Sequence, residues 1–170
     1  MTRPSRLLKT LTPVIPMLIA ATACSDTCTE NKNAVPLAGF YASGSSITDR
    51  ITVDSVEVIG AEMPADSALS AASVRKDELY LPFRIDSDTT TYIFAERRRD
   101  APRESTVRFI YSRTPRFVSV ECGVSYIFDI RKIVCEGTLI DSVVCPTGFI
   151  DNTNAENIRI YFAGQNEETP

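Results

Sequence analysis

The most reactive side chains are those of five cysteines, and the chain contains no histidine. Without histidine, Ser-His-Asp and Cys-His nucleophile pairs cannot form, and the commonest protein ligand for metals is missing. None of the four cysteines after Cys24 lies in a C-x₂₋₄-C pair, so their spacing does not predict a zinc site. The sequence predicts no metal and no cofactor. The five cysteines are Cys24, Cys28, Cys122, Cys135 and Cys145.

A pair of carboxylates is the one enzymatic arrangement that this composition leaves open. Glycoside hydrolases need two carboxyl groups about 5–10 Å apart, and the acid of the pair has a raised pKa. Glu121 stands on the expected outward face of a strand, and Glu57 or Glu156 could lie near it. Acidic residues on the wet face of a sheet are more often simply solvated, so we predict that the protein is not an enzyme.

Two further groups of residues could bind a glycan or a phosphate. Arg97–Arg99 with Arg103 could hold an anion, but interleaved acidic residues neutralise them in part, which is typical of a soluble hairpin tip. Tyrosines could stack on sugars, although most of them fall within strand patterns and are expected to cap the core. These tyrosines are Tyr41, Tyr92, Tyr111, Tyr126 and Tyr161.

The first 23 residues have the pattern of a targeting segment. Arg3, Arg6 and Lys9 precede the uncharged stretch Leu11–Ala23. That stretch is shorter than the ~20 apolar residues of a membrane-spanning helix and suits a signal peptide. It ends in Ala21-Thr22-Ala23-Cys24, which resembles a lipobox. At such sites the cysteine receives a diacylglyceryl group, with acyl chains such as palmitate, and becomes the new N-terminus.

Ordinary secretory cleavage after the A-x-A sequence Ala21-Thr22-Ala23 is the alternative. Lipidation of Cys24 favours the lipoprotein hypothesis, because it leaves four cysteines that can pair completely in an oxidising compartment. We predict the bridges Cys28–Cys122 and Cys135–Cys145. Cys122 lies on the same face of the expected long strand as several valines, and that face should point into the core. Cys135 and Cys145 flank another expected strand. The alternative is that Cys135 and Cys145 stay free thiols.

The predicted organisation is a signal peptide at 1–23, a lipidated tether at 24–33 and one domain at 34–170. The segment before Cys24 holds three of the 18 basic residues and none of the 22 acidic ones, so the mature net charge is −7. This balance argues against a nucleic-acid partner, which would require a basic face. Membrane attachment would depend on the acyl chains.

Apolar residues alternate with polar ones through most of the domain, which is the pattern of half-buried strands. We predict an antiparallel β-sandwich of about eight strands, with a small β-barrel as the alternative. Gly123 is expected to form a bulge or bend within one long strand. Ala65–Lys76 is the one helix candidate, and a loop is the alternative there. The expected strands are 35–42, 50–59, 78–86, 90–97, 105–112, 116–130, 138–145 and 157–162.

Several segments, in this order, resemble a family of small lipoproteins of unknown function from Bacteroidetes. They are Cys28-Thr29-Glu30-Asn31, Leu37-Ala38-Gly39-Phe40-Tyr41, the run TPRFVSVECGVSYIFDI at 114–130, LIDSV at 139–143 and ENIRIYF at 156–162. The resemblance implies a lipid anchor, an envelope location and a β-rich fold. It carries over no catalytic or binding residue.

We therefore expect a non-catalytic envelope lipoprotein that serves as a structural or protein-interaction module. A ligand-binding β-domain for glycan, lipid or peptide is the alternative, and a carboxylate-based hydrolase is a third hypothesis. Ser25 follows Cys24, and no aspartate stands directly beside the cysteine as an inner-membrane retention signal would have. The expected location is the outer membrane, on its periplasmic or surface face.

Overall fold

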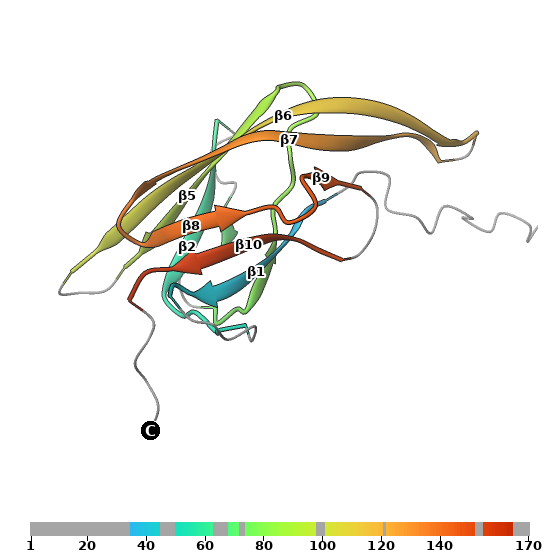
Figure 1. Cartoon of the computed structure of the whole chain (residues 1–170). Helices are drawn as coiled ribbons and strands as arrows, with labels where there is room; N and C mark the ends of the chain where they lie inside the picture. Colours follow the sequence, from blue (N-terminus) through green and yellow to red (C-terminus); the bar gives the residue numbers. More distant parts are fainter. Residues whose placement is uncertain are drawn as a thin grey trace, which may run out of the picture.

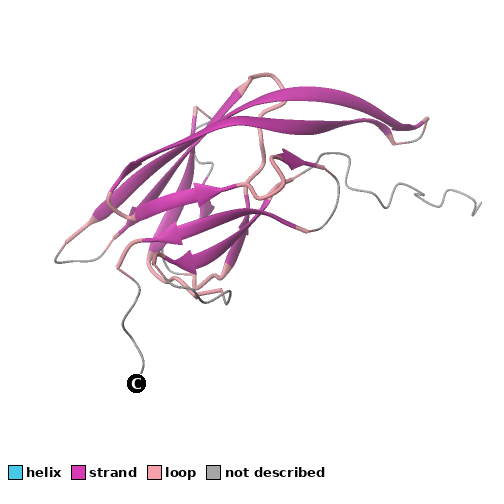
Figure 2. Ribbon diagram, viewed as in Figure 1, coloured by secondary structure: helices cyan, strands magenta, loops and turns pink. Residues whose placement is uncertain are grey.

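The computed structural model describes seven segments of the chain, and those segments contain ten strands and no helix (Figure 2). Among these residues no helix is long and apolar enough to cross a membrane. The described residues are 35–44, 50–62, 68–71, 74–97, 101–120, 122–151 and 155–164. The strands are β1 (Leu37–Ala42), β2 (Val56–Ala61), β3 (Ala68–Ser70), β4 (Glu78–Tyr80), β5 (Thr89–Glu96), β6 (Arg103–Ser119), β7 (Gly123–Gly137), β8 (Ile140–Val144), β9 (Phe149–Ile150) and β10 (Glu156–Phe162).

The strands form two sheets, which confirms the predicted β-sandwich (Figure 1). One sheet has the order β4-β1-β10-β8, and the other has the order β3-β2-β5-β6-β7-β9. Neighbouring strands pair antiparallel except β1 and β10, which run parallel with Phe40 opposite Ile160. The first and last strands of the domain therefore lie side by side.

Aromatic rings from both sheets meet in the core. Phe162 of β10 lies edge-on to Phe40 of β1, with centroids 5.2 Å apart, and to Phe94 of β5 at 6.5 Å. Phe83, which precedes β5, stacks on Tyr111 of β6 at 4.7 Å. Such edge-to-face and offset pairs add about 0.5–1.5 kcal/mol each beyond the burial of their area. The contact between Phe94 and Phe162 joins the two sheets.

The chain passes from one sheet to the other at a corner between β7 and β8. Gly137 ends β7 at a φ of 123°. The hydroxyl of Ser105, on the facing strand, accepts hydrogen bonds from the amides of Leu139 and Ile140, both at 2.9 Å. The amide of Thr138 donates to the carbonyl of Glu104 at 3.0 Å. The corner therefore satisfies three backbone donors away from regular strand pairing.

A long hairpin, β6–β7, extends past the end of the sandwich (Figure 1). β5 pairs with β6 only as far as Ile110, whereas β7 continues to pair with it as far as Ser119. The expected strand 116–130 is therefore wrong. Turn residues Val120 and Cys122 divide it, and Gly123 opens β7 at a φ of 76° instead of bulging mid-strand. Pro115 also does not break the strand, because it lies on the outer ribbon, opposite Tyr126 alone.

The other expectations agree with the structure to different degrees. The strands expected at 35–42, 90–97, 138–145 and 157–162 correspond to β1, β5, β8 and β10. The strand expected at 50–59 is limited to β2 with an isolated bridge at Val53, and the one expected at 78–86 ends at Tyr80. The helix candidate Ala65–Lys76 is wrong, because Ala68–Ser70 pairs with β2 as a strand. Pairing with a sheet edge outweighs the weak helical preference of this alanine-rich segment.

Candidate functional site

Five polar side chains gather on the four-stranded sheet, on the face away from the core. They are named the Glu156 cluster: Tyr41, Arg50, Glu78, Glu156 and Arg159. Side chains alternate along a strand, so Phe40 points into the core and Tyr41 away from it. The Tyr41 hydroxyl donates to Glu156 Oε2 at 2.7 Å, and Arg50 Nε donates to the same oxygen at 3.0 Å. Arg159 Nε donates to Glu156 Oε1 at 2.9 Å, and Arg50 also pairs with Glu78.

A glycine makes room for this carboxylate. A Cβ atom at Gly39 would lie 2.1 Å from Glu156 Oε2 and 2.9 Å from its Cδ. Real Cβ contacts are never this short, so a side chain at position 39 would displace Glu156 or the strand. The glycine therefore lets the carboxylate lie directly over the backbone of β1.

The electrostatics of the cluster keep Glu156 ionised. Burial alone raises the pKa of Glu156, but hydrogen bonds from Tyr41, Arg159 and Arg50 together hold that pKa below its usual range. Burial, and then the bond to Glu156, raises the pKa of Tyr41. A glycosidase acid requires the opposite shift in its carboxyl group. The geometry of Glu156 is that of a structural anion which ties β1 to β10.

Two of the three candidate carboxylates, Glu57 and Glu156, can be placed in the structure, and they belong to different sheets. Glu57 of β2 pairs with Arg97 at 3.2 Å in the six-stranded sheet, whereas Glu156 belongs to the four-stranded sheet. Glu121 lies outside the described residues. Glu57 and Glu156 therefore lie in different sheets, and a pairing of Glu121 with either of them stays a prediction.

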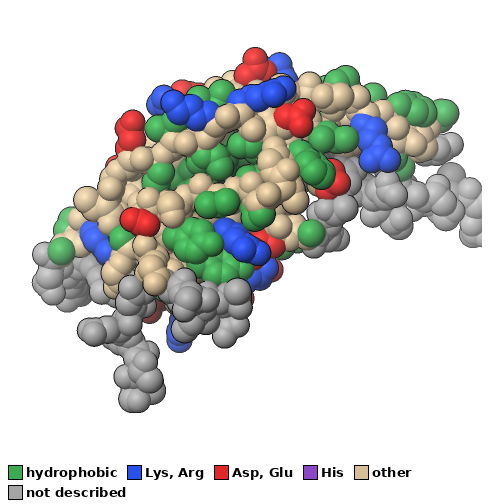
Figure 3. All heavy atoms as spheres, in the orientation of Figure 1, with side chains coloured by type: hydrophobic (Ala, Val, Ile, Leu, Met, Phe, Trp, Pro, Cys, Tyr) green, Lys and Arg blue, Asp and Glu red, His purple; other side chains and the backbone are tan. Residues whose placement is uncertain are grey.

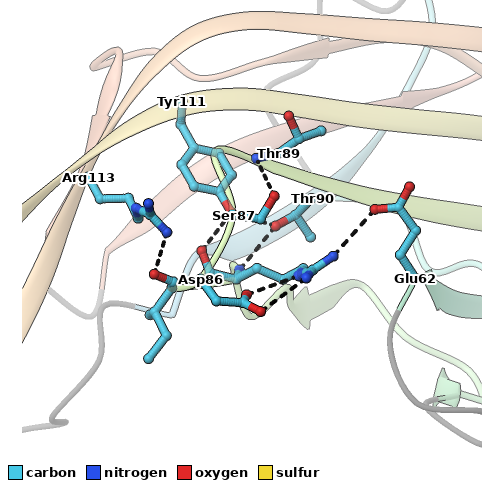
Figure 4. Close-up of polar contacts among 9 residues, drawn as sticks. Glu62, Asp86, Ser87, Thr89, Thr90, Tyr111 and Arg113 are labelled. Atoms are coloured by element: carbon cyan, nitrogen blue, oxygen red, sulfur yellow. Dashed lines mark hydrogen bonds and ion pairs between the residues drawn. The ribbon is translucent and has the colours of Figure 1, made fainter.

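A second polar network fastens the loop 81–88, between β4 and β5, onto β6 (Figure 4). Three hydrogen bonds form a closed ring. The Arg84 amide donates to Thr90 Oγ1 at 3.0 Å, Thr90 Oγ1 lies 2.7 Å from the Tyr111 hydroxyl, and Tyr111 donates to the Arg84 carbonyl at 2.8 Å. Burial raises the pKa of Tyr111, so its proton stays in place to make this bond. The ring satisfies both backbone groups of Arg84.

Ion pairs surround this ring on the solvent side. The Arg84 guanidinium contacts Asp86 at 3.1 Å and Glu62 at 3.4 Å. Arg113 of β6 contacts Asp88 at 3.3 Å and donates to the Ile85 carbonyl. Figure 4 shows Glu62, Asp86 and Arg113 around the loop, with Tyr111 and Thr90 beside it. The charges pair with one another, which is typical of a structural fastening.

The arginine group predicted as an anion site is divided between different partners. Arg97 pairs with Glu57, as described above. Arg103 pairs with Glu96, whose side chain is 1% exposed, at 2.8 Å, and donates to the Ala163 carbonyl at 2.9 Å. Arg98 and Arg99 lie outside the described residues. Arg103 is thus engaged in fixing the C-terminal end of β10.

The candidate tyrosines are mostly structural. Tyr92 and Tyr111 are buried in the core, which confirms that expectation for them, and the Tyr92 hydroxyl donates to the Pro82 carbonyl. Tyr41 is also buried, but within the Glu156 cluster. Tyr126 and Tyr161 are half-buried. The described tyrosines do not form an exposed stacking row.

Two of the predicted disulfide cysteines are separate thiols, so the predicted Cys135–Cys145 bridge is wrong. The Cys135 thiol lies 3.6 Å from the carbonyl of Ile140, at the start of β8. Cys145 follows the far end of β8, about 17 Å further along an extended strand. A disulfide needs Cα atoms within about 7 Å, so β8 holds these two cysteines apart.

Of the other three cysteines, Cys122 lies at a position different from the expected one, and Cys24 and Cys28 lie outside the described residues. Cys122 lies in the turn between β6 and β7, not in the middle of a core strand as its parity suggested. Its amide donates to the Ser119 hydroxyl at 3.0 Å. Cys24 and Cys28 lie outside the described residues, so lipidation of Cys24 and the Cys28–Cys122 bridge stay predictions. Within the described residues no group of three His, Cys, Asp or Glu side chains could hold a metal.

The end of the hairpin carries a surface that the sequence pattern did not reveal. We name Phe117, Val120 and Val124 the apolar tip; their exposed fractions are 66%, 85% and 47%. Phe117 faces Val124 across the hairpin, and Val120 lies in the turn. Figure 3 shows hydrophobic side chains gathered at the far end of the hairpin. Alternation predicted core positions for Val120 and Val124, because a period of two cannot distinguish a core face from an exposed ribbon.

Comparison with known proteins gives one family. The model of a family of unknown function (DUF6452) matches residues 44–162. No curated protein and no solved structure matches the chain.

Proposed function

The chain belongs to the family of unknown function DUF6452, and we propose that it is a non-catalytic lipoprotein of the cell envelope. In this proposal a lipid on Cys24 holds the β-sandwich at a membrane, where the domain serves as a structural or interaction module. The observation that carries the proposal is the uncharged segment Leu11–Ala23, which follows three basic residues and ends directly at Cys24.

Two features of the domain support a non-catalytic role. The Glu156 cluster and the network around Tyr111 use their charged groups to hold strands and a loop in place. The lowered pKa of Glu156 suits an anion and does not suit a general acid. We expect the purified mature protein to hydrolyse neither common glycosides nor peptides. Turnover abolished by a Glu156→Gln substitution would contradict this part of the proposal.

Substitution of Cys24 tests the anchor. The Cys24→Ala variant cannot accept a diacylglyceryl group, so it should leave the membrane fraction or stay unprocessed. Fractionation of cells, followed by immunoblotting and mass determination of the N-terminal peptide, measures both outcomes. Cys145→Ala, which removes a thiol from the domain, is the matched control and should remain with the membrane. Unchanged membrane fractionation of Cys24→Ala would refute the proposal.

The same proposal places the protein in the outer membrane. Ser25 follows Cys24, so the mature chain would not begin with the Cys-Asp sequence expected of an inner-membrane retention signal. Sucrose-gradient separation of the two membranes tests this location. Co-migration of the lipoprotein with inner-membrane markers would contradict it.

A further inference from the structure

We propose that the apolar tip enters the surface of the membrane that holds Cys24, an inference that rests on the proposed lipid anchor. The tip consists of Phe117 and Val124, which face each other across the hairpin, and Val120 in the turn. Exposed apolar side chains that gather in one place mark contact surfaces more often than scattered ones do. Here they occupy the most projecting part of the described chain (Figures 1 and 3).

The dimensions of the chain allow the anchor and the tip to meet one lipid surface. The outer part of β6, from Ser112 to Ser119, extends about 24 Å along the ribbon. The eleven residues from Cys24 to Val35 can span at most about 36–40 Å. The tether is therefore long enough to match the projection of the hairpin.

The described chain also begins at the end of the sandwich from which the hairpin projects (Figure 1). Leu37, the first residue of β1, pairs with Glu156 of β10. β10 follows β9, which pairs with β7 at Phe128, at the root of the projecting part. A lipid on Cys24 would thus hold this end of the molecule toward the bilayer.

The chemistry of the tip suits a lipid surface. A phenylalanine and two valines provide apolar area, and the exposed Arg116 precedes Phe117 along β6. Apolar side chains next to a basic residue are typical of segments at the membrane interface, where the cation meets phosphate. The mature chain has a net charge of −7, so anionic head groups would repel the body of the domain more than its tip. Glu121, between Val120 and Cys122 in the sequence, lies outside the described residues.

The absence of tryptophan makes a direct test available. In the Val120→Trp variant the only tryptophan reports from the tip. The lipidated protein is reconstituted into vesicles of phosphatidylethanolamine and phosphatidylglycerol that contain a brominated phosphatidylcholine, which quenches tryptophan on contact. Glu136→Trp is the matched control, because this exposed position on β7 lies twelve residues from Val124, about 41 Å along the strand. We expect blue-shifted emission and several-fold greater quenching for Val120→Trp than for Glu136→Trp.

The outcomes separate the tip from the anchor. Phe117→Trp provides a second reporter if Val120→Trp folds poorly, as judged by circular dichroism. Equal quenching of tip and control, or none, would overturn the inference. A blue shift without quenching would indicate that a protein or a second copy covers the tip, and would overturn it too. Mass spectrometry of the same samples reports the acyl group on Cys24, so failure of the proposed function is read independently.

Discussion

At the scale of single residues, the best-defined feature is a carboxylate held by three donors. Glu156 accepts hydrogen bonds from Tyr41, Arg50 and Arg159, which come from β1, the segment before β2 and β10. Charge-assisted bonds of this kind are about twice as strong as neutral ones. The position of Gly39 beneath the carboxylate makes the arrangement sensitive to single substitutions.

Glu156→Gln should destabilise the fold by about 1–2 kcal/mol at neutral pH, because the amide keeps the shape but loses the charge. The pKa of Glu156 is lowered in the folded protein from 4.5, so its stabilising effect is present above that value. It is lost as the pH falls through the folded pKa. Urea unfolding at several pH values should show the difference between wild type and variant narrowing below about pH 4.5. A difference that is constant with pH would contradict the charge argument, and Glu136→Gln on the exposed end of β7 is the control.

Tyr111→Phe should cost about 1–2 kcal/mol, because it leaves the Arg84 carbonyl and the Thr90 hydroxyl without their shared partner in a buried place. The aromatic ring is unchanged in this variant, so its packing against Phe83 is kept. Thermal unfolding of the variant measures the loss. Tyr80→Phe, at an exposed position, should have little effect. Equal losses of stability for the two variants would indicate that the hydrogen bonds of Tyr111 do not stabilise the fold.

At the scale of elements, the corner between β7 and β8 connects the two sheets and tolerates little change. A Cβ at Gly137 would lie 2.2 Å from the Glu104 carbonyl and 2.6 Å from Ser105 Cα. Both are backbone atoms, which cannot turn aside as the end of a flexible side chain can. The pairing of β6 with β7 would have to shift at the position where Ser105 bonds the corner.

Gly137→Ala should therefore destabilise the protein by about 3–4 kcal/mol, from overpacking combined with backbone strain. Gly148→Ala provides a control that separates the two causes. Gly148 also has a positive φ, 73°, but a Cβ there would meet nothing within 4 Å. Its cost should be about 1–2 kcal/mol, from strain alone. Similar midpoints of urea unfolding for both variants would contradict the steric argument.

The sequence predicted the elements better than their limits. The expected strands at β1, β5, β8 and β10 agree best with the structure. In β10, the buried residues Ile158, Ile160 and Phe162 alternate with more exposed ones, as the sequence pattern predicted. This pattern failed at the hairpin turn, where Val118, Val120, Cys122 and Val124 continue the alternation through residues that reverse direction. It also missed β3 and β9, which are three and two residues long, too short to show a period.

The candidate site was predictable only in part. Glu156 attracted notice as a carboxylate, but its partners Arg50 and Tyr41 are 106 and 115 residues away along the chain. Pairing over such distances depends on which strands become neighbours. Local periodicity contains no information about that choice, so the sequence could not show that arginines balance the charge of Glu156.

At the scale of the whole molecule, the cysteines are expected in two states: two free thiols and one disulfide bridge. Alkylation under denaturing, non-reducing conditions should label Cys135 and Cys145, which are free thiols. In the native state Cys135 should react slowly, since burial raises the pKa of its thiol. Cys28 and Cys122 should appear as one cross-linked peptide, and loss of that bridge should cost about 4–5 kcal/mol in the chain-entropy model. A Cys135–Cys145 peptide would contradict the structure, and free Cys28 and Cys122 would refute the remaining bridge.

The parallel pairing of β1 with β10 has a consequence for the order in which the domain can be completed. Synthesis delivers β1 first, yet this strand lies between β4 and β10. Only β4 is available early, through a short register from Leu37 to Gly39. The amide and carbonyl groups on the other edge of β1 must wait until residue 162 has emerged. Folding of the domain is therefore incomplete until β10 is available, and a chain truncated before β10 exposes an open edge to aggregation.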